Sequence, residues 1–101
     1  MDTDELSNEA YTAVLVEAER FHHNMSLHFG VLADDCNTEE EYLAAAEKMA
    51  KNIKTFTTDS LDDFLFNEVD DISALPATLD KILANIARVR EVPEEERMYE
   101  F

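Results

Sequence analysis

Hydrophobic residues recur along the chain at the three- and four-residue spacings of helices. The first and longest stretch with this pattern spans residues 4–32, with no proline and no glycine before Gly30. When successive residues are set about 100° apart, its apolar side chains gather on one broad face. They are Ala10, Tyr11, Val14, Leu15, Ala18, Phe21, Met25, Phe29 and Leu32. The pattern predicts one continuous helix of roughly 40 Å that packs against two or more neighbours.

Two apolar residues of this stretch, Val16 and Leu27, lie nearly opposite the broad face. Scattered apolar residues are common on protein surfaces. The alternative interpretation is a second contact surface for a tail, a subunit or a partner.

Three more helices are predicted, over residues 38–57, 60–72 and 75–92. Thr38 with Glu41 matches the capping box that begins a helix, and Ser60 with Asp63 gives a second helix start. Pro76 suits the first turn of the last helix. The apolar stripes are Tyr42, Ala46, Met49, Ile53 and Phe56 in the second helix, and Leu75, Leu79, Ile82, Ile86 and Val89 in the last. Acidic residues crowd the third helix, which we expect to be the shortest and least regular.

Four helices with short connections indicate an all-α protein, specifically a small antiparallel four-helix bundle in a single domain over residues 1–101. The alternative architecture is a helical hairpin that completes its core by forming a dimer. Composition agrees with the all-α class. Hydrophobic residues make up 46% of the chain, while one glycine and two prolines leave few tight turns for a β fold.

The chain carries 24 acidic and 8 basic residues and a formal net charge of −16. This charge argues against direct binding to nucleic acid or to an anionic membrane. It is compatible with a basic protein partner, and one version of that function is mimicry of DNA phosphates. The acidic residues predicted to contact the partner are Glu39, Glu40, Asp62, Asp63, Asp70 and Asp71. The tail, residues 93–101, is expected to fold back on the bundle or to dock on a partner through Tyr99 and Phe101.

Nothing in the chain singles out an enzyme active site or a cofactor. One glycine leaves no glycine-rich phosphate loop, and Cys36 lies beside Asp34 and Asp35, which disfavour a reactive thiolate. A single cysteine permits no internal disulfide, and we find neither a signal-peptide pattern nor an apolar run long enough to span a membrane. We therefore expect a cytoplasmic, non-enzymatic protein.

A metal site is the alternative function. Glu19 and His22 form an E-x-x-H pair, a spacing that supplies metal ligands in di-iron helical bundles, and His23 and His28 lie nearby. However, the chain has no second E-x-x-H. On one helix His22 and His28 would lie within or beside the apolar face and His23 on the opposite side, so the three could not converge on one ion. The residues therefore favour hydrogen-bonded structural histidines over a metal site formed by Glu19, His22 and His23.

A third function comes from a short motif. The segment Asp59-Ser60-Leu61-Asp62 resembles the D-S-L segment of acyl carrier proteins, which are small acidic helical bundles. The resemblance implies a carrier role with phosphopantetheine attached to Ser60. The residues alone favour Ser60 as the cap of the helix over 60–72.

Overall fold

The computed structural model describes residues 1–65, 67–69 and 72–99. Within these ranges every regular element is helical, which confirms the all-α class. The α-helices are α1 (Asn8–Tyr11), α2 (Glu17–Phe21), α3 (His23–Val31), α4 (Glu39–Ile53), α5 (Thr58–Phe64) and α6 (Leu75–Glu91). The other elements are the 3-10 turns η1 (Thr3–Glu5), η3 (Leu32–Asp35) and η4 (Glu94–Glu96) and the π-helical segment η2 (Thr12–Val16).

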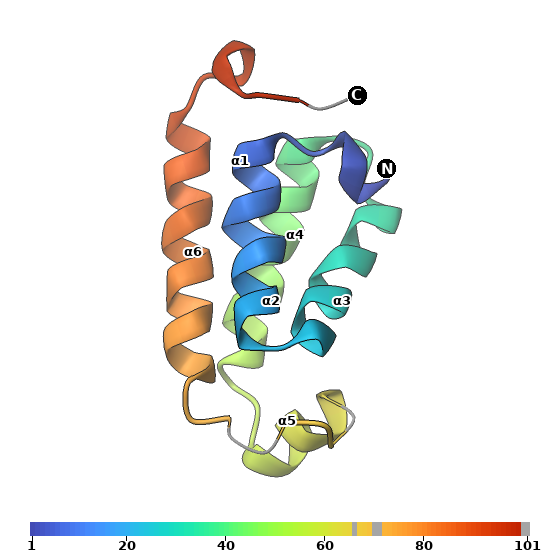
Figure 1. Ribbon diagram of the computed structural model, residues 1–101, viewed down its shortest axis with the longest axis vertical. Coiled ribbons are helices and arrows are strands. Elements are labelled where there is room, and N and C mark those ends of the chain that lie inside the picture. The colour runs from blue at the N-terminus through green and yellow to red at the C-terminus, as the bar shows by residue number, and fades with distance from the viewer. Residues whose placement is uncertain (66, 70–71, 100–101) are drawn as a thin grey trace.

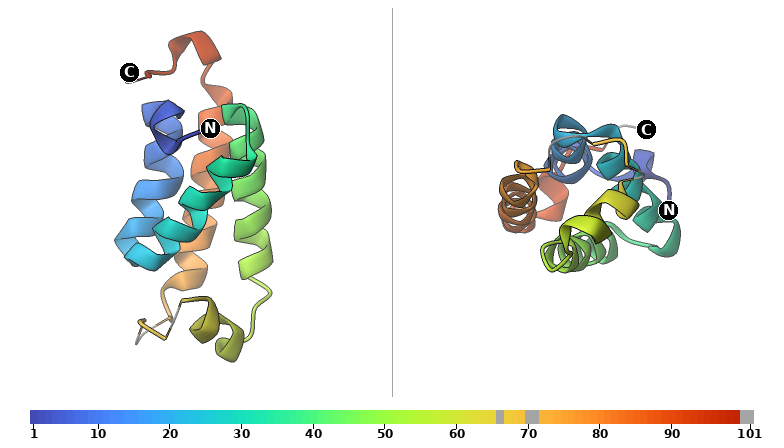
Figure 2. Two further views of the ribbon diagram at one scale, coloured as in Figure 1. Left: turned by 90° about the vertical axis from the view of Figure 1, so that its right-hand side faces the viewer. Right: turned by 90° about the horizontal axis from the view of Figure 1, so that it is seen from below.

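The helices lie side by side along the long axis of the molecule. In Figure 1 the chain descends through α1, η2 and α2, returns upward through α3, descends again through α4 and ascends through α6. Helix α5 lies beneath the lower ends of these helices in both side views (Figures 1 and 2). In the part of the chain that the structure describes, no helix has the length and apolar character needed to cross a membrane.

The predicted uninterrupted helix over 4–32 is wrong, because the backbone breaks at His22. His22 adopts an extended conformation, with φ −167° and ψ 147°, and its side chain accepts a hydrogen bond from the Asn24 amide that begins α3. The break reverses the chain, so α2 and α3 become neighbours (Figure 1). Met25 and Phe29 on α3 are then fully buried in the same core as Val14. The hairpin is favoured over a single long helix because it buries apolar residues from both sides of the His22 break in one core.

Leu6 and Ser7 are extended, so continuous helix begins at Asn8 and not at residue 4, and from there to Phe21 it contains the π-helical turn η2. In a π turn each backbone hydrogen bond joins residues five apart instead of four. The turn therefore changes the direction in which side chains after it point relative to those before it. Ala10, Val14 and Ala18 are completely buried, as the pattern predicts. Tyr11 was predicted on the same face, but it is 42% exposed.

Helices α4 and α6 match the predicted apolar patterns closely. All five stripe residues of α6 are buried, and α6 ends one residue before the predicted end. Helix α4 begins with Thr38 as its N-cap, whose hydroxyl accepts from the Glu41 amide at 3.1 Å. The Glu41 carboxylate accepts from the amide of Asn37 instead of that of Thr38. Helix α4 ends at Ile53, four residues before the predicted end.

The third predicted helix begins earlier and ends sooner than expected. Helix α5 covers Thr58–Phe64, and its N-cap is Thr57, whose hydroxyl accepts from the Ser60 amide at 3.2 Å. Ser60 is therefore in the first turn of α5 and is not its cap. Positions 66, 70 and 71 of the predicted 60–72 helix lie outside the described residues.

Candidate functional site: an apolar face surrounded by carboxylates

Two adjoining depressions, with volumes of about 520 and 430 Å³, lie between the α1–α2 segment and α3. Of the four large hydrophobic side chains that are exposed among the described residues, three line them: Tyr11, Leu27 and Val31. Leu27 and Val31 are 50% and 58% exposed and stand four residues apart on α3, so they are neighbours on its surface. These side chains form an apolar surface on this side of the molecule.

Carboxylates line the same depressions as these apolar side chains, and Arg20 also lines the smaller one. Asp4, Glu19 and Asp34 line the larger depression, and Asp4 and Asp34 form no ion pair within the described residues. The Glu19 carboxylate lies 2.9 Å from Nδ1 of His23, and this hydrogen bond lowers the pKa of Glu19 below its ordinary value. We call Tyr11, Leu27 and Val31, together with Asp4, Glu19 and Asp34, the apolar–acidic face.

Sequence reasoning found part of this face. Leu27 and Val16 were noted as apolar residues opposite the broad stripe, and both line the depressions. Tyr11 and Val31 were missed, because a continuous helix places Tyr11 in the core. Val31 could have been found from its spacing, because it stands four residues after Leu27 and so lies beside it on a helix surface.

Glu39, predicted to contact a partner, is instead buried inside the molecule. Only 7% of Glu39 is exposed, and its carboxylate accepts hydrogen bonds from the Ser7 amide at 2.5 Å, Arg97 at 2.7 Å and the Tyr99 hydroxyl at 3.2 Å. We call these four residues the Glu39 clasp. An antiparallel bridge between Ser7 and Tyr99 holds the tail beside the N-terminal segment. Tyr99 is therefore docked on its own chain.

The remaining predicted contacts are dispersed. Glu40 is exposed and pairs with Arg90 of α6 at 3.2 Å. Asp63 is exposed and Asp62 is half-buried on α5. Asp70, Asp71 and Phe101 lie outside the described residues. The four described acidic residues of this set, Glu39, Glu40, Asp62 and Asp63, do not form one patch, because Glu39 is buried, Glu40 is in the first turn of α4 and the other two lie on α5.

The three histidines have separate roles. His22 caps α3, His23 pairs with Glu19, and Nε2 of His28 lies 2.6 Å from the Phe64 carbonyl oxygen. The His28 ring also stacks on Phe64, with ring centroids 3.8 Å apart. Among the described residues, no three His, Cys, Asp or Glu side chains are arranged to hold a metal ion. The break at His22 also removes the helical geometry on which the E-x-x-H argument rested.

Ser60 and Cys36, the candidate carrier serine and the single cysteine, both form hydrogen-bond contacts with nearby residues. Ser60 is exposed, and its hydroxyl lies 3.0 Å from that of Thr57. Cys36 is buried, and its thiol donates to the carbonyl of Leu32 at 3.3 Å. Burial raises the pKa of Cys36, with nearby Glu41 and Asp35 acting in the same direction. The thiol therefore stays protonated near neutral pH.

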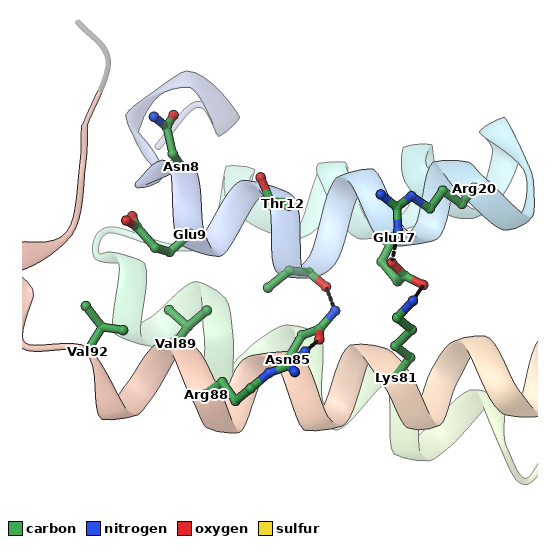
Figure 3. A pocket seen from close by; sticks show the side chains of 11 residues that line it. Asn8, Glu9, Thr12, Glu17, Arg20, Lys81, Asn85, Arg88, Val89 and Val92 are labelled. Carbon is green, nitrogen blue, oxygen red and sulfur yellow. Dashed lines mark hydrogen bonds and ion pairs between the residues drawn. The ribbon is translucent and has the colours of Figure 1, made fainter.

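A groove of about 540 Å³ lies between the α1–α2 segment and α6 (Figure 3). Near one end, the Glu17 carboxylate pairs with Arg20 at 3.2 Å and with Lys81 at 3.3 Å. Midway along it, Asn85 donates to the Ala13 carbonyl at 3.2 Å. Asn85 also accepts a hydrogen bond from Arg88. We call this feature the α1–α6 groove.

No protein-family model, curated protein or solved structure significantly matches this chain.

Proposed function

We propose that this protein is a non-enzymatic interaction module that binds a basic, amphipathic segment of a protein partner on the apolar–acidic face. In this proposal an antiparallel bundle of four rods, α1–α2, α3, α4 and α6, is the scaffold that presents the face. The observation that carries the proposal is that the exposed Tyr11, Leu27 and Val31 line one depression together with carboxylates. Mimicry of DNA phosphates is the narrower version, in which the partner is a nucleic-acid-binding protein.

The apolar side chains and the carboxylates of the face contribute differently to binding. Exposed apolar side chains supply binding free energy when a partner covers them, and a few such anchors dominate many interfaces. The carboxylates, together with the net charge of −16, attract a cationic partner and raise its association rate. A partner segment with apolar residues along one side and Lys or Arg at its edges satisfies both components.

The test is an NMR titration of the isotope-labelled protein with a designed amphipathic helical peptide of leucine and lysine, about 14 residues long. A scrambled peptide of the same composition is the control for charge alone. We expect the amphipathic peptide to perturb the amide signals of Tyr11, Leu27 and Val31 most strongly. We also expect the scrambled peptide to bind weakly and without preference for any face.

Variants separate apolar contact from charge. Val31→Asp removes an anchor while adding negative charge, and Ala44→Asp adds the same charge at an exposed position of α4. We expect Val31→Asp to weaken amphipathic-peptide binding about 10-fold or more, the effect of losing an interface anchor. Ala44→Asp should leave binding unchanged or slightly tighter. Equal affinity of both variants, or signal changes centred away from the face, would disprove the proposal.

A further inference from the structure

The α1–α6 groove has the size and lining of a small-molecule site. Ligand pockets are about 300–1,000 Å³, mainly apolar, with a few well-placed polar groups. This groove measures about 540 Å³, and Ala13, Val89 and Val92 form its apolar lining. It shares no lining residue with the larger depression of the apolar–acidic face, and only Arg20 with the smaller one.

Basic residues are concentrated at this groove, although the chain as a whole is strongly acidic. Three of the eight basic residues, Arg20, Lys81 and Arg88, line it. Two carboxylates also line the groove. Glu17, whose side chain is 10% exposed, pairs with Arg20 and Lys81, and Glu9 accepts a hydrogen bond from the Met98 amide at 3.0 Å. Arg88 forms no ion pair with any described residue, and Lys48 is the only other such basic residue.

The local structure holds the Arg88 guanidinium at the groove. Asn85 is 9% exposed, and its carboxamide oxygen accepts from Arg88 while its nitrogen donates to the Ala13 carbonyl. Ala13 belongs to the π-helical segment η2, and π turns within helices occur frequently at functional sites. Figure 3 shows the chain of contacts from η2 through Asn85 to Arg88. Asn85 thus connects the backbone of Ala13, in one wall of the groove, to the guanidinium of Arg88.

We propose that the α1–α6 groove binds a small carboxylate that carries an apolar body. The carboxylate pairs with Arg88, whose planar guanidinium matches carboxylate geometry through two parallel hydrogen bonds. The apolar body packs along Ala13, Val89 and Val92, of which Ala13 and Val89 are already buried and Val92 is half-buried, so that Val92 contributes most of the surface removed from water. This site would operate independently of the apolar–acidic face.

Octanoate is the probe for this site, followed by amide NMR shifts of the intact chain. Acetate tests the carboxylate without the apolar body, and octanol tests the body without the charge. We expect octanoate to shift the amides of Ala13, Arg88 and Val89, with acetate and octanol each binding at least about 10-fold more weakly. Equal binding of octanol and octanoate, or shifts centred elsewhere, would overturn the proposal.

Two substitutions complete the test. Arg88→Gln should weaken octanoate binding about 10-fold or more, because it removes a charge-assisted hydrogen-bond donor. Lys48→Gln removes the other basic residue that pairs with no carboxylate in the described part of the chain, and it should leave the affinity unchanged. Equal effects of the two variants would show that only general electrostatic attraction operates. Failure here leaves the peptide experiment unaffected, since octanoate and peptide are mapped to different residues.

Discussion

The Glu39 clasp provides the sharpest test of the structure, through the substitutions Glu39→Gln and Arg97→Met. The Glu39 and Arg97 side chains are 6% and 8% exposed, and their atoms lie 2.7 Å apart. Either substitution leaves the other charge in a site from which water is largely excluded. In Glu39→Gln the side-chain NH₂ group would replace one carboxylate oxygen. It would then face donors of Ser7, Arg97 or Tyr99 that need an acceptor.

Removing one member of a buried ion pair costs about 3–5 kcal/mol, because the remaining charge is left uncompensated. We expect each single substitution to lower the free energy of unfolding by about 3 kcal/mol. That is a large part of the roughly 5–15 kcal/mol that stabilises a typical domain. The corresponding fall in Tm is about 12 °C or more for a chain of this size.

Urea unfolding of the two single variants and the double variant measures this effect. The double variant should lose less stability than the sum of the singles, with a coupling of about 1 kcal/mol or more. Glu40→Gln is the matched control, because its pair with Arg90 is exposed and should contribute no more than about 1 kcal/mol. Additive losses, or single losses below about 1 kcal/mol, would refute our account of the clasp.

The clasp also predicts how stability changes with pH. Burial raises the pKa of Glu39, but hydrogen bonds from Ser7, Arg97 and Tyr99 lower it, and the net pKa is below its ordinary value of 4.5. Because the folded-state pKa is lowered, the stabilisation is present above pH 4.5 and is lost as the pH falls through the lowered pKa. Acid unfolding of Glu39→Gln should therefore depend less on pH in that range than acid unfolding of the unmodified protein.

Three further predictions concern single residues. Gly30→Ala should raise stability by about 0.5–1 kcal/mol in thermal unfolding, because Gly30 is inside α3 and a new Cβ would meet Leu15 only at 3.8 Å; a loss of stability would contradict this packing. Tyr42→Phe should cost about 1 kcal/mol in urea unfolding by removing the buried hydroxyl that donates to the Phe29 carbonyl at 2.9 Å; unchanged stability would contradict that hydrogen bond. Cys36 should react with a thiol reagent far more slowly in the folded than in the urea-unfolded protein, since burial raises its pKa and blocks access; equal rates would show that the site is open.

The sequence predicts α6 almost completely and the beginning of α4, because each is an amphipathic helix with a local start signal. The stripe from Leu75 to Val89 and the cap at Thr38 depend on neighbours within a few residues. The break at His22 carries no comparable signal, since neither proline nor glycine stands there. It depends on the packing of α3 against distant helices, and tertiary packing overrides local preference.

The role of Glu39 could not be inferred from its local sequence for a similar reason. Acidic residues are favoured in the first turn of a helix, so Glu39 resembles its exposed neighbour Glu40. Only the return of the tail, 58 residues later, brings Arg97 to its carboxylate. A contact at such sequence separation leaves no periodic pattern in the residues on either side of it.

The clasp also has a consequence for the order of events in folding. The hairpin of α2 and α3 joins residues close in sequence, whereas the bridge between Ser7 and Tyr99 must close a loop that includes most of the chain. Closing so long a loop loses more chain entropy than closing a short one, which favours early helical hairpins and late joining of the two ends. We expect Arg97→Met to accelerate unfolding strongly while leaving the refolding rate nearly unchanged. The clasp would then determine how long the folded state persists more than how quickly it is reached.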